Sequence, residues 1–495
     1  RMLLYGAGNS GILLARDVKH STAVKIVGFL DDDPRKAASV IAGTRVLGGG
    51  DSIEKIVHQH RVDEVVITMA SPPADLLRRV LEKCREVSVP LKIIPDVQKI
   101  LLGHASIGQI QDIRLEDLLG RECVDVTRHE NTIRQVYSGK RILVTGAGGS
   151  IGSELVRQLV LFEPQSVTLL DKDENSVYEL QQELLHKFPE ALFEPRVADI
   201  RQAERLNAIF RECKPQIVFH AAAHKHVPLM ECNPCEAILN NVLGTEVLLQ
   251  VCREWDVEQF VYISSDKAVY PSNVMGATKR IGELMVRSFA EDGGLRAACV
   301  RFGNVLGSRG SVIPLFQKQI ARGGPITVTH PEITRYFMTI PEAVRLVLCA
   351  GTLGIAGETF VLDMGVPRKI LDIAHEMIAL AGLRPEQIEV KITGLRSGEK
   401  LYEELVESTE ALQSTNVEKL WKVASNGQNK NFSLGSIAQL INAARQNDRS
   451  RVYEQLFHLG IGFQADTTEF DFPVHLAPSV PSYLSAAASG SINER

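Results

Sequence analysis

Residues 140–152 read KRILVTGAGGSIG, and this stretch decides the fold of the larger part of the chain. Residues 141–145 form a mostly apolar run of strand length, and a glycine-rich turn then opens an amphipathic helix. Glycines let the backbone turn tightly against a pyrophosphate, and the N-terminus of the helix offers free N–H groups to it. Asp171 ends the next predicted strand, where a carboxylate accepts hydrogen bonds from a ribose. The stretch therefore predicts a dinucleotide-binding unit.

Apolar runs of strand length alternate with helical patterns downstream of this turn, which is typical of a parallel sheet covered by helices. Further strands are predicted at 166–170, 191–197, 217–220, 259–264 and 297–302. With the first strand they make six, the number in a full dinucleotide-binding sheet. Beyond Gly303 the pattern loosens into short strands and helices, which predicts a smaller substrate-binding lobe.

A similar turn, GAGNSG at residues 6–11, lies near the start of the chain and is followed by Asp31, Asp32 and Asp33. Strands are predicted around it at 2–5, 25–30, 64–68 and 91–94, with helices at 11–20, 52–60 and 74–86. We therefore predict an α/β protein with two tandem Rossmann-like, doubly wound parallel sheets. The predicted division is an accessory unit at 1–123, a linker at 124–139, a catalytic unit at 140–462 with its lobe at about 303–462, and a flexible tail at 463–495.

Composition narrows the class of protein. The 495 residues are 44% hydrophobic and 23% charged, with a net charge of −5 and no long basic block, so nucleic acid is not an expected partner. Eight scattered cysteines favour a reducing compartment, and no metal is predicted, because Cys232 and Cys235 lack a second pair. No apolar run reaches the length of a membrane span. Because residue 1 is Arg and a strand begins at once, we expect an N-terminal truncation that conceals any membrane anchor.

The second turn is the predicted catalytic one because of the residues downstream of it. Asp199 and Ile200 are placed to meet an adenine ring, and the small residues at 221–223 let a cofactor lie against the sheet edge. Asp171 favours NAD, since a carboxylate repels a 2′-phosphate, although Lys172 beside it keeps NADP as the alternative. The first turn has no comparable sequel, and we interpret it as a regulatory or vestigial nucleotide site.

A resemblance becomes specific further along. The 145–152 turn, Ser264-Ser265 and the helical Lys279 resemble the extended short-chain dehydrogenase/reductase family. Within it, one subgroup is similar from about residue 140 to 404: the bacterial UDP-N-acetylglucosamine 4,6-dehydratases of polysaccharide and glycoprotein synthesis. The stretches that carry this likeness are Asp266-Lys267, HKHVP at 224–228, RFGNVLGS at 301–308 and GLRSGEK at 394–400.

One position departs from the general family. A tyrosine usually stands four residues before the helical lysine, on the same helix face, where it removes a proton from the substrate. Here that position is Met275, and a thioether cannot take a proton. The long dehydratases resemble this chain in having Met there, so we interpret Met275 as a mark of the subgroup.

The resemblance implies oxidation of the sugar at carbon 4, elimination of water across carbons 5 and 6, and return of hydride to carbon 6, with tightly bound NAD recycled. Elimination needs a base and an acid, and the resemblance makes Lys267 the base and Asp266 the acid. Ser265 is placed to bond the oxygen on carbon 4, and Lys279 to hold the nicotinamide ribose. The other cofactor-binding residues implied are Gly146, Gly149, Ser150, Ile151, Gly152, Asp171, Lys172, Asp199, Ile200, Ala221, Ala222 and Lys225. Substrate binding is implied for Ser265, Lys267, Asn304, Ser308, Arg309, Arg396 and Glu399.

Two rival functions stay open at this point. A UDP-sugar 4-epimerase needs the same oxidation but no acid and base for elimination. In a non-catalytic nucleotide-sensing homologue, Met275 would mark the loss of catalysis. The partner expected is UDP-N-acetylglucosamine, and we expect a homo-oligomer. We expect this fragment to be soluble, with the full-length protein held at the cytoplasmic face of the bacterial inner membrane through its absent N-terminal segment.

Overall fold

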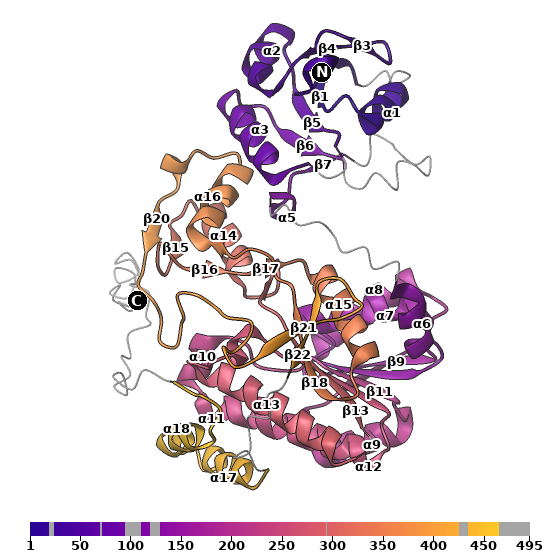
Figure 1. The fold of residues 1–495 in the computed structure, drawn as a ribbon, viewed down its shortest axis with the longest axis vertical. Coiled ribbons are helices and arrows are strands. Elements are labelled where there is room, and N and C mark those ends of the chain that lie inside the picture. Colours follow the sequence, from indigo (N-terminus) through magenta and orange to yellow (C-terminus); the bar gives the residue numbers. More distant parts are fainter. Residues whose placement is uncertain are drawn as a thin grey trace, which may run out of the picture.

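The computed structural model describes residues 1–18, 24–69, 72–94, 110–118, 129–293, 295–424 and 434–464. Its ribbon has two α/β units (Figure 1), with the N-terminal unit at one end and the larger unit at the other. A lobe built from the later part of the chain lies between them. The prediction of two tandem α/β units with parallel-sheet cores is confirmed.

The N-terminal sheet has the strand order β3-β4-β2-β1-β5-β6-β7. Strands β4, β2, β1, β5 and β6 are parallel, and β3 and β7 are antiparallel edges. Apolar clusters lie on both faces, as expected of a parallel sheet between helices. The elements are β1 (Met2–Tyr5), α1 (Asn9–Val18), β2 (Ile26–Leu30), β3 (Val40–Ile41), β4 (Thr44–Gly48), α2 (Ile53–His60), β5 (Glu64–Ile67), α3 (Ala74–Glu86), β6 (Leu91–Ile93), β7 (Gln111–Asp112) and α5 (Leu115–Leu118).

The larger sheet has nine strands in the order β10-β9-β8-β11-β12-β13-β18-β22-β21. All six predicted strands are present, and β18 adds a seventh parallel strand beside β13, followed by an antiparallel edge. The strands are β8 (Arg141–Thr145), β9 (Ser166–Asp171), β10 (Phe193–Val197), β11 (Ile217–His220), β12 (Gln259–Ile263), β13 (Arg296–Arg301), β18 (Ala356–Leu362), β21 (Ala411–Ser414) and β22 (Leu420–Ala424).

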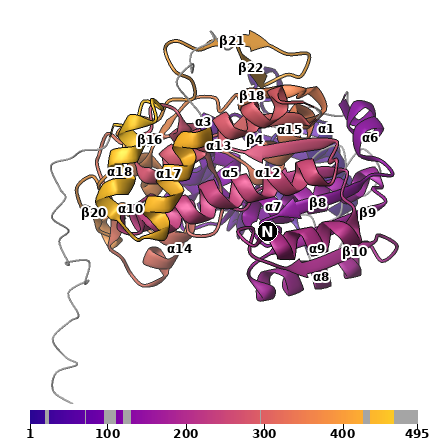
Figure 2. The same ribbon diagram turned by 90° about the horizontal axis from the view of Figure 1, so that it is seen from below.

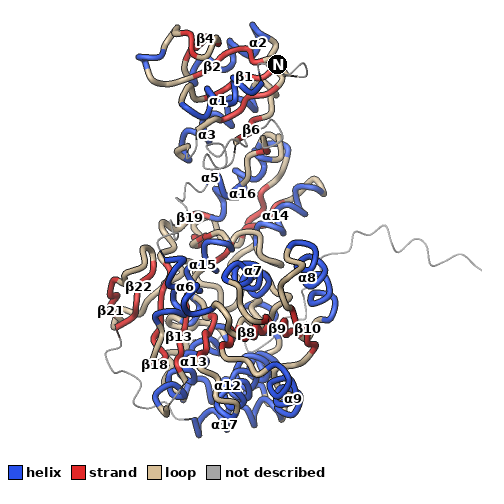
Figure 3. Tube along the Cα trace, turned by 90° about the vertical axis from the view of Figure 1, so that its right-hand side faces the viewer, coloured by secondary structure: helices blue, strands red, loops and turns tan. Residues whose placement is uncertain are grey.

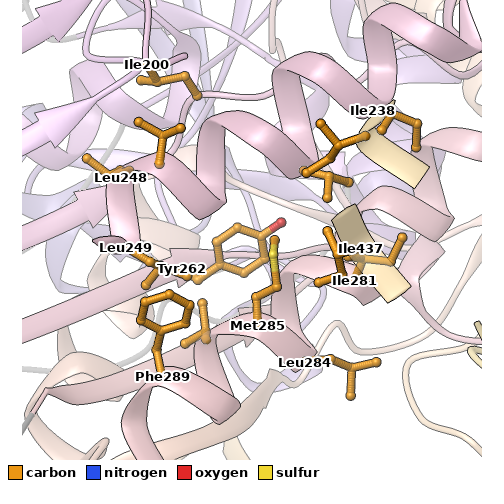
Figure 4. Packing of buried hydrophobic residues seen from close by; sticks show 14 of the residues in the cluster. Ile200, Ile238, Leu248, Leu249, Tyr262, Ile281, Leu284, Met285, Phe289 and Ile437 are labelled. Carbon is orange, nitrogen blue, oxygen red and sulfur yellow. The ribbon is translucent and has the colours of Figure 1, made fainter. Parts of the chain in front are cut away.

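Helices cover both faces of this sheet and bury two large apolar clusters. Figure 4 shows one of them, in which Tyr262 from the sheet packs among Leu248, Ile281 and Met285 from the covering helices. In the described part of the chain, no helix is both long enough and apolar enough to cross a membrane. The helices are α6 (Glu130–Tyr137), α7 (Ser150–Leu159), α8 (Glu174–Lys187), α9 (Ala203–Cys213), α10 (Val227–Cys232), α11 (Pro234–Ala237), the π-helix η7 (Ile238–Leu243), α12 (Gly244–Glu254), α13 (Val274–Glu291) and α15 (Ile340–Leu353).

The smaller lobe is visible in Figure 3 between the two units, where short strands and helices alternate. Its three two-stranded ladders pair β14 with β17, β15 with β20, and β16 with β19, around an apolar cluster of its own. The elements are β14 (Asn304–Val305), α14 (Val312–Ala321), β15 (Ile326–Val328), β16 (Thr334–Arg335), β17 (Phe337–Met338), β19 (Arg368–Lys369), α16 (Ile370–Leu380) and β20 (Val390–Ile392).

Two segments of the predicted division can be followed in the described residues: the linker at 124–139 and the start of the tail at 463. Residues 129–139 of the predicted linker include α6, whose Ile133 and Tyr137 are fully buried, and the Tyr137 hydroxyl donates to the Leu348 carbonyl. This segment is helical because its apolar residues have a face of the larger unit to cover. Helices α17 (Leu434–Arg445) and α18 (Arg449–His458) pack beside α10 and α11 (Figure 2), and Phe463, at the start of the predicted tail, is buried against Tyr453. Residues 119–128 and 465–495 lie outside the described residues.

Candidate active site

A cleft lies at the carboxyl ends of β8, β11, β12 and β13, where ligands bind in doubly wound sheets. It consists of two adjoining cavities of about 140 and 500 Å³ that share Gly149, Ala221, Ala223 and His224. Nineteen predicted site residues line the two cavities: Gly146, Gly149, Ser150, Ile151, Gly152, Asp171, Lys172, Asp199, Ile200, Ala221, Ala222, Lys225, Ser265, Lys267, Met275, Lys279, Asn304, Ser308 and Arg309.

The glycine turn between β8 and α7 is shaped for close approach. Gly146 has a φ of +66°, which favours glycine, and a Cβ there would lie 2.7 Å from the Ala222 nitrogen. A Cβ on Gly152 would clash with the Gly146 carbonyl oxygen, so only glycine lets α7 pack onto its own loop. The N-terminus of α7 thus opens onto the cleft with space for a pyrophosphate, and the residues present fit a dinucleotide.

Asp171 stands at the end of β9, at the ribose position of the predicted site. Its two carboxylate oxygens accept backbone N–H groups, from Gly148 at 3.0 Å and from Asp173 at 3.1 Å. The Lys172 ammonium turns aside and lies 3.5 Å from both His224 Nε2 and Asn240 Oδ1. The carboxylate, rather than the ammonium, is therefore held against the glycine turn.

The inner end of the smaller cavity is lined by Asp199 and Ile200. The Asp199 carboxylate is partly buried, which raises its pKa, but a two-point ion pair with Arg201 offsets burial and leaves the pKa lowered. The sequence prediction missed Asn240 and Asn241 on η7. Asn241 bonds both the N–H and the carbonyl of His224, which fixes the loop after β11, and Asn240 lines the cavity. A π-helix at such a place is a frequent mark of a functional site.

The Asp266-Lys267 pair follows β12 and lies at the larger cavity. The Lys267 ammonium is 3.0 Å from Asp266 Oδ1, and the Ser265 hydroxyl donates to the same oxygen at 2.8 Å. Asp266 is 1% exposed and does not line the cavity, whereas Lys267 does. Burial lowers the pKa of Lys267, but the Asp266 and Glu403 carboxylates outweigh it and leave that pKa raised. The Lys267 side chain is therefore held as an ammonium.

Lys279 and Met275 share one face of α13 at the larger cavity. Lys279 donates to the Ile263 carbonyl at 2.8 Å, and burial lowers its pKa to about 8. The first turn of α13 lies against the loop after β12, and a Cβ on Gly276 would clash with the Lys267 carbonyl oxygen in that loop. Glycine at that position brings the first turn of α13 against the Asp266-Lys267 segment.

The substrate-lobe side of the cleft is closed by residues 304–311. The Lys225 ammonium lies 3.4 Å from the Ser308 hydroxyl, and burial lowers the pKa of Lys225. Arg309 reaches back over the glycine turn, with its backbone N–H on the Ser150 hydroxyl and its guanidinium on Ser176. Two cationic side chains therefore stand where the cleft passes from the sheet to the lobe.

Two predicted substrate residues lie outside the two cavities. Arg396 is exposed on the loop after β20, and its backbone N–H donates to Glu399 at 3.2 Å. Glu399 lies 3.5 Å from the Arg335 guanidinium. The following turn nevertheless reaches the catalytic loop, since Glu403, which the sequence prediction missed, comes within 3.5 Å of Lys267. No local pattern distinguishes Glu403 from Glu404 beside it.

Together, the doubly wound sheet, the glycine turn and Lys279 on the helix after β12 define an extended short-chain dehydrogenase/reductase. The chain belongs to the polysaccharide biosynthesis protein family, whose model matches residues 142–425. A CoA-binding domain model matches residues 6–95. Among the described residues, no group of three or more His, Cys, Asp or Glu side chains is placed to hold a metal ion.

Known relatives span two kinds of activity. The probable polysaccharide biosynthesis protein EpsC of Bacillus subtilis is 46% identical over 83% of this chain and 69% of its own length. A UDP-N-acetylglucosamine 4,6-dehydratase (inverting) of Campylobacter jejuni is 31% identical over 61% of this chain and 90% of its own. A UDP-glucose 4-epimerase of Rickettsia rickettsii is 33% identical over 60% and 86%. The X-ray structure of Pen from Bacillus thuringiensis superposes with a TM-score of 0.53 and 31% identity, covering 59% of this chain and 89% of that one.

Proposed function

We propose that the protein is an NAD-dependent 4,6-dehydratase that converts UDP-N-acetylglucosamine to UDP-2-acetamido-2,6-dideoxy-hexos-4-ulose. The observation that carries the proposal is the buried Asp266-Lys267 pair, joined at 3.0 Å, beside the same cavity as the glycine turn. Elimination of water needs an acid and a base at one place, and oxidation alone does not. The polysaccharide biosynthesis family supports an early step in bacterial glycan synthesis.

The cofactor would be held by the glycine turn at its pyrophosphate, by Asp171 at the adenine ribose and by Lys279 at the nicotinamide ribose. When bound, NAD supplies a hydride acceptor for sugar carbon 4 and a hydride donor for carbon 6. Asp171 supports NAD over NADP because its carboxylate is held against the glycine turn, where it would meet the adenine ribose and repel a 2′-phosphate. The Lys279 charge favours departure of hydride from the substrate.

The elimination balances on two side chains. Lys267 is held as an ammonium, so one proton first passes from Lys267 to Asp266 along their hydrogen bond. The neutral amine then takes the proton from carbon 5, and the Asp266 acid protonates the carbon-6 hydroxyl, which leaves as water. This returns the ammonium and the carboxylate, and Lys267 later gives its proton back to carbon 5. The proton released from the carbon-4 hydroxyl during oxidation then recharges the Lys267 amine, which closes the cycle. Ser265 is within reach to orient the oxygen on carbon 4.

The diphosphate and uridine would be bound from the lobe. Lys225, Ser308 and Arg309 form a cationic and hydroxyl-bearing wall next to the glycine turn, and Asn304 lines the same cavity. Arg396 and Glu399 are proposed to meet the uridine and phosphate from the loop after β20. Met275 leaves this site without a tyrosine base, so deprotonation of the carbon-4 hydroxyl falls to a water or to Lys267 itself.

Mass spectrometry of the product tests the proposal directly. Purified protein incubated with UDP-N-acetylglucosamine should yield a product lighter by one water, and Lys267→Ala should abolish it while dinucleotide stays bound. A UDP-sugar 4-epimerase, the second candidate favoured by the epimerase relatives, would give a product of unchanged mass. Absence of turnover with any UDP-sugar would favour the nucleotide-sensing alternative.

A further inference from the structure

The turn that begins at Gly398 is distant in sequence from the loop after β12, but it packs against that loop. The Gly398 carbonyl accepts from the Ser272 hydroxyl at 3.1 Å and from Asn273 at 3.0 Å, where α13 begins. The Lys400 ammonium donates to the Val269 carbonyl at 3.0 Å. These contacts fix the chain from 398 onward against the segment that carries Lys267, and they bring Glu403 to it.

Glu403 shares the Lys267 ammonium with Asp266. Its side chain is 4% exposed, and Oε1 lies 3.5 Å from Lys267 Nζ and 3.7 Å from Arg335 Nε. Oε2 is buried with no hydrogen-bond partner among the described residues. A buried carboxylate with an unused oxygen is costly unless a donor reaches it at some stage.

The charges around Lys267 come from three elements. Asp266 belongs to the loop after β12, Arg335 to β16, and Glu403 to the docked turn, and Glu399 lies beside the Nη2 atom of Arg335. The inner four groups are two carboxylates and two cations. When the Lys267 proton passes to Asp266, the Asp266 carboxylate ceases to be an ionic anchor, and Glu403 is the carboxylate that remains beside the amine.

We propose that Glu403 is a positioning residue that anchors the Lys267 amine through the elimination, with Arg335 holding Glu403 in place. This inference rests on the proposed function, in which Lys267 is the base. Glu403 keeps the free enzyme's Lys267 charged and fixes the direction of its amine after the proton has moved. Because an adjacent negative charge favours bound protons, it also sets the pH range in which the pair carries the single proton that it needs.

Glu403→Gln tests this role, since it keeps the shape and removes the charge. Both pH limits of kcat/KM should move to lower pH, by about one to three units for a charge lost this close. The kcat should fall by about 100-fold, while KM should change little, because the residue acts in the reacting state rather than in binding. Glu403→Asp retains the charge, so its pH limits should stay near those of the wild type with a reduced kcat.

Glu404→Gln is the matched control, because it removes an equal charge from the same turn. Glu404 faces Lys400 at 3.8 Å and its side chain is 55% exposed. Its pH profile should match that of the wild type. Unchanged pH limits in Glu403→Gln, in protein with wild-type cofactor content and thermal midpoint, would overturn the inference. If that variant fails to fold, Glu403→Asp decides, and an unreduced kcat there would also overturn it.

A readout without substrate separates this inference from the proposed function. NMR of protein carrying ¹³Cε-lysine follows the titration of Lys267, assigned through Lys267→Arg. The titration should move to lower pH in Glu403→Gln and not in Glu404→Gln. If the wild type forms no dehydrated product, the proposed function fails. The effect of Glu403 on Lys267 is tested separately, and it would be disproved if the Lys267 titration did not move in Glu403→Gln.

Discussion

The two glycine turns have the same local construction but different surroundings. In each, a glycine with positive φ follows the first strand, and a carboxylate at the end of the next strand accepts a loop N–H: Ala7 to Asp31 at 2.8 Å, and Gly148 to Asp171 at 3.0 Å. Both carboxylates accept two backbone N–H groups, but Asp31 is also paired with the Lys36 ammonium at 2.8 Å. The two turns therefore share one local construction and differ in the charged partner of the carboxylate.

Replacing the last glycine of each turn, Gly152 or Gly11, by alanine should give the largest difference. A Cβ on Gly152 would clash with the Gly146 carbonyl, and a Cβ on Gly11 would clash with the Gly6 carbonyl. Each variant should destabilise its own unit by about 1–3 kcal/mol. Only Gly152→Ala should also weaken dinucleotide binding, by about 100-fold, because it displaces the loop under the pyrophosphate.

Mass spectrometry of the cofactor released from purified protein measures the loss of dinucleotide binding. Hydrogen exchange shows which unit each substitution destabilises. Gly11→Ala is the control for general destabilisation. Loss of the dinucleotide in Gly11→Ala, with Gly152→Ala retaining it, would reverse the roles assigned to the two turns.

Removing each carboxylate sharpens the comparison further. Asp171→Asn should lower NAD affinity by about 10- to 100-fold, the effect expected for a hydrogen bond to a charged group. Asp31→Asn should leave NAD affinity unchanged and act on stability. Burial raises the pKa of Asp31, but Lys36 and two backbone N–H groups outweigh it, so this pKa is lowered and its stabilisation is lost as pH falls.

Titration calorimetry with NAD provides the affinities, and urea unfolding at neutral and acidic pH provides the stabilities. The stability gap between wild type and Asp31→Asn should narrow below about pH 4, where carboxylates protonate. An equal loss of NAD affinity in both variants would contradict this prediction, because it would mean that Asp31 binds NAD despite its ion pair with Lys36.

Local sequence predicted much of this fold because local rules build it. The turn at 146–152 and the carboxylate of Asp171 belong to one βαβ unit, so their geometry follows from residues close together in the chain. Strand β18 was missed because Ala356, Gly357 and Glu358 interrupt its apolar pattern, and its place beside β13 depends on the whole sheet.

The site was less predictable where it depends on distant segments. Glu403 reaches Lys267 because Gly398 and Lys400 bond to the segment that follows β12, and no spacing in the sequence encodes that contact. Asn241 was missed for a similar reason, since its bonds to the loop at His224 depend on the π-helical register of η7. The sequence therefore predicted residues with reactive side chains, such as Lys267, but it did not predict the distant residues that contact them, such as Glu403.

A smaller difference concerns acid stability. His220 ends β11 and is buried between the hydroxyls of Thr145 and Thr245, and burial lowers its pKa to about 3. In the first unit, Thr68 follows the corresponding strand β5 and bonds the Gly6 carbonyl with a hydroxyl that does not titrate. Below about pH 6.5 the unfolded chain protonates His220 while the folded chain does not, so folding weakens as pH falls.

His220→Gln should therefore make the larger unit less sensitive to acid. The unfolding free energy of wild type should fall more steeply than that of the variant between about pH 6.5 and 4.5, by up to about 1.4 kcal/mol per pH unit. Urea unfolding at four pH values measures both slopes, and Thr68→Ser serves as the control in the first unit. Parallel slopes in wild type and His220→Gln would show that His220 does not carry this sensitivity.

The smallest effect is expected where the two units meet. Arg78 on α3 and Arg368 on β19 both reach Glu376 on α16 at 2.7 Å, and Leu380 packs against the apolar clusters of both units. Glu376→Gln should increase hydrogen exchange in α3 and α16, at a cost of about 1 kcal/mol for partly exposed ion pairs. Turnover should change by less than about twofold, since Glu376 lines neither cavity of the cleft.

Asp75→Asn is the matched control, because Asp75 pairs with Arg78 from the same helix and its side chain is 91% exposed. It should leave exchange in α16 at the wild-type level. A large loss of turnover in Glu376→Gln, but not in Asp75→Asn, would contradict the expectation that the first unit has little effect on turnover. A series of contacts leads from Glu376 to Arg368 on β19, from there to Arg335 on β16, and from Arg335 to Glu403 beside Lys267. Such a loss of turnover would therefore indicate that the first unit regulates the Asp266-Lys267 pair.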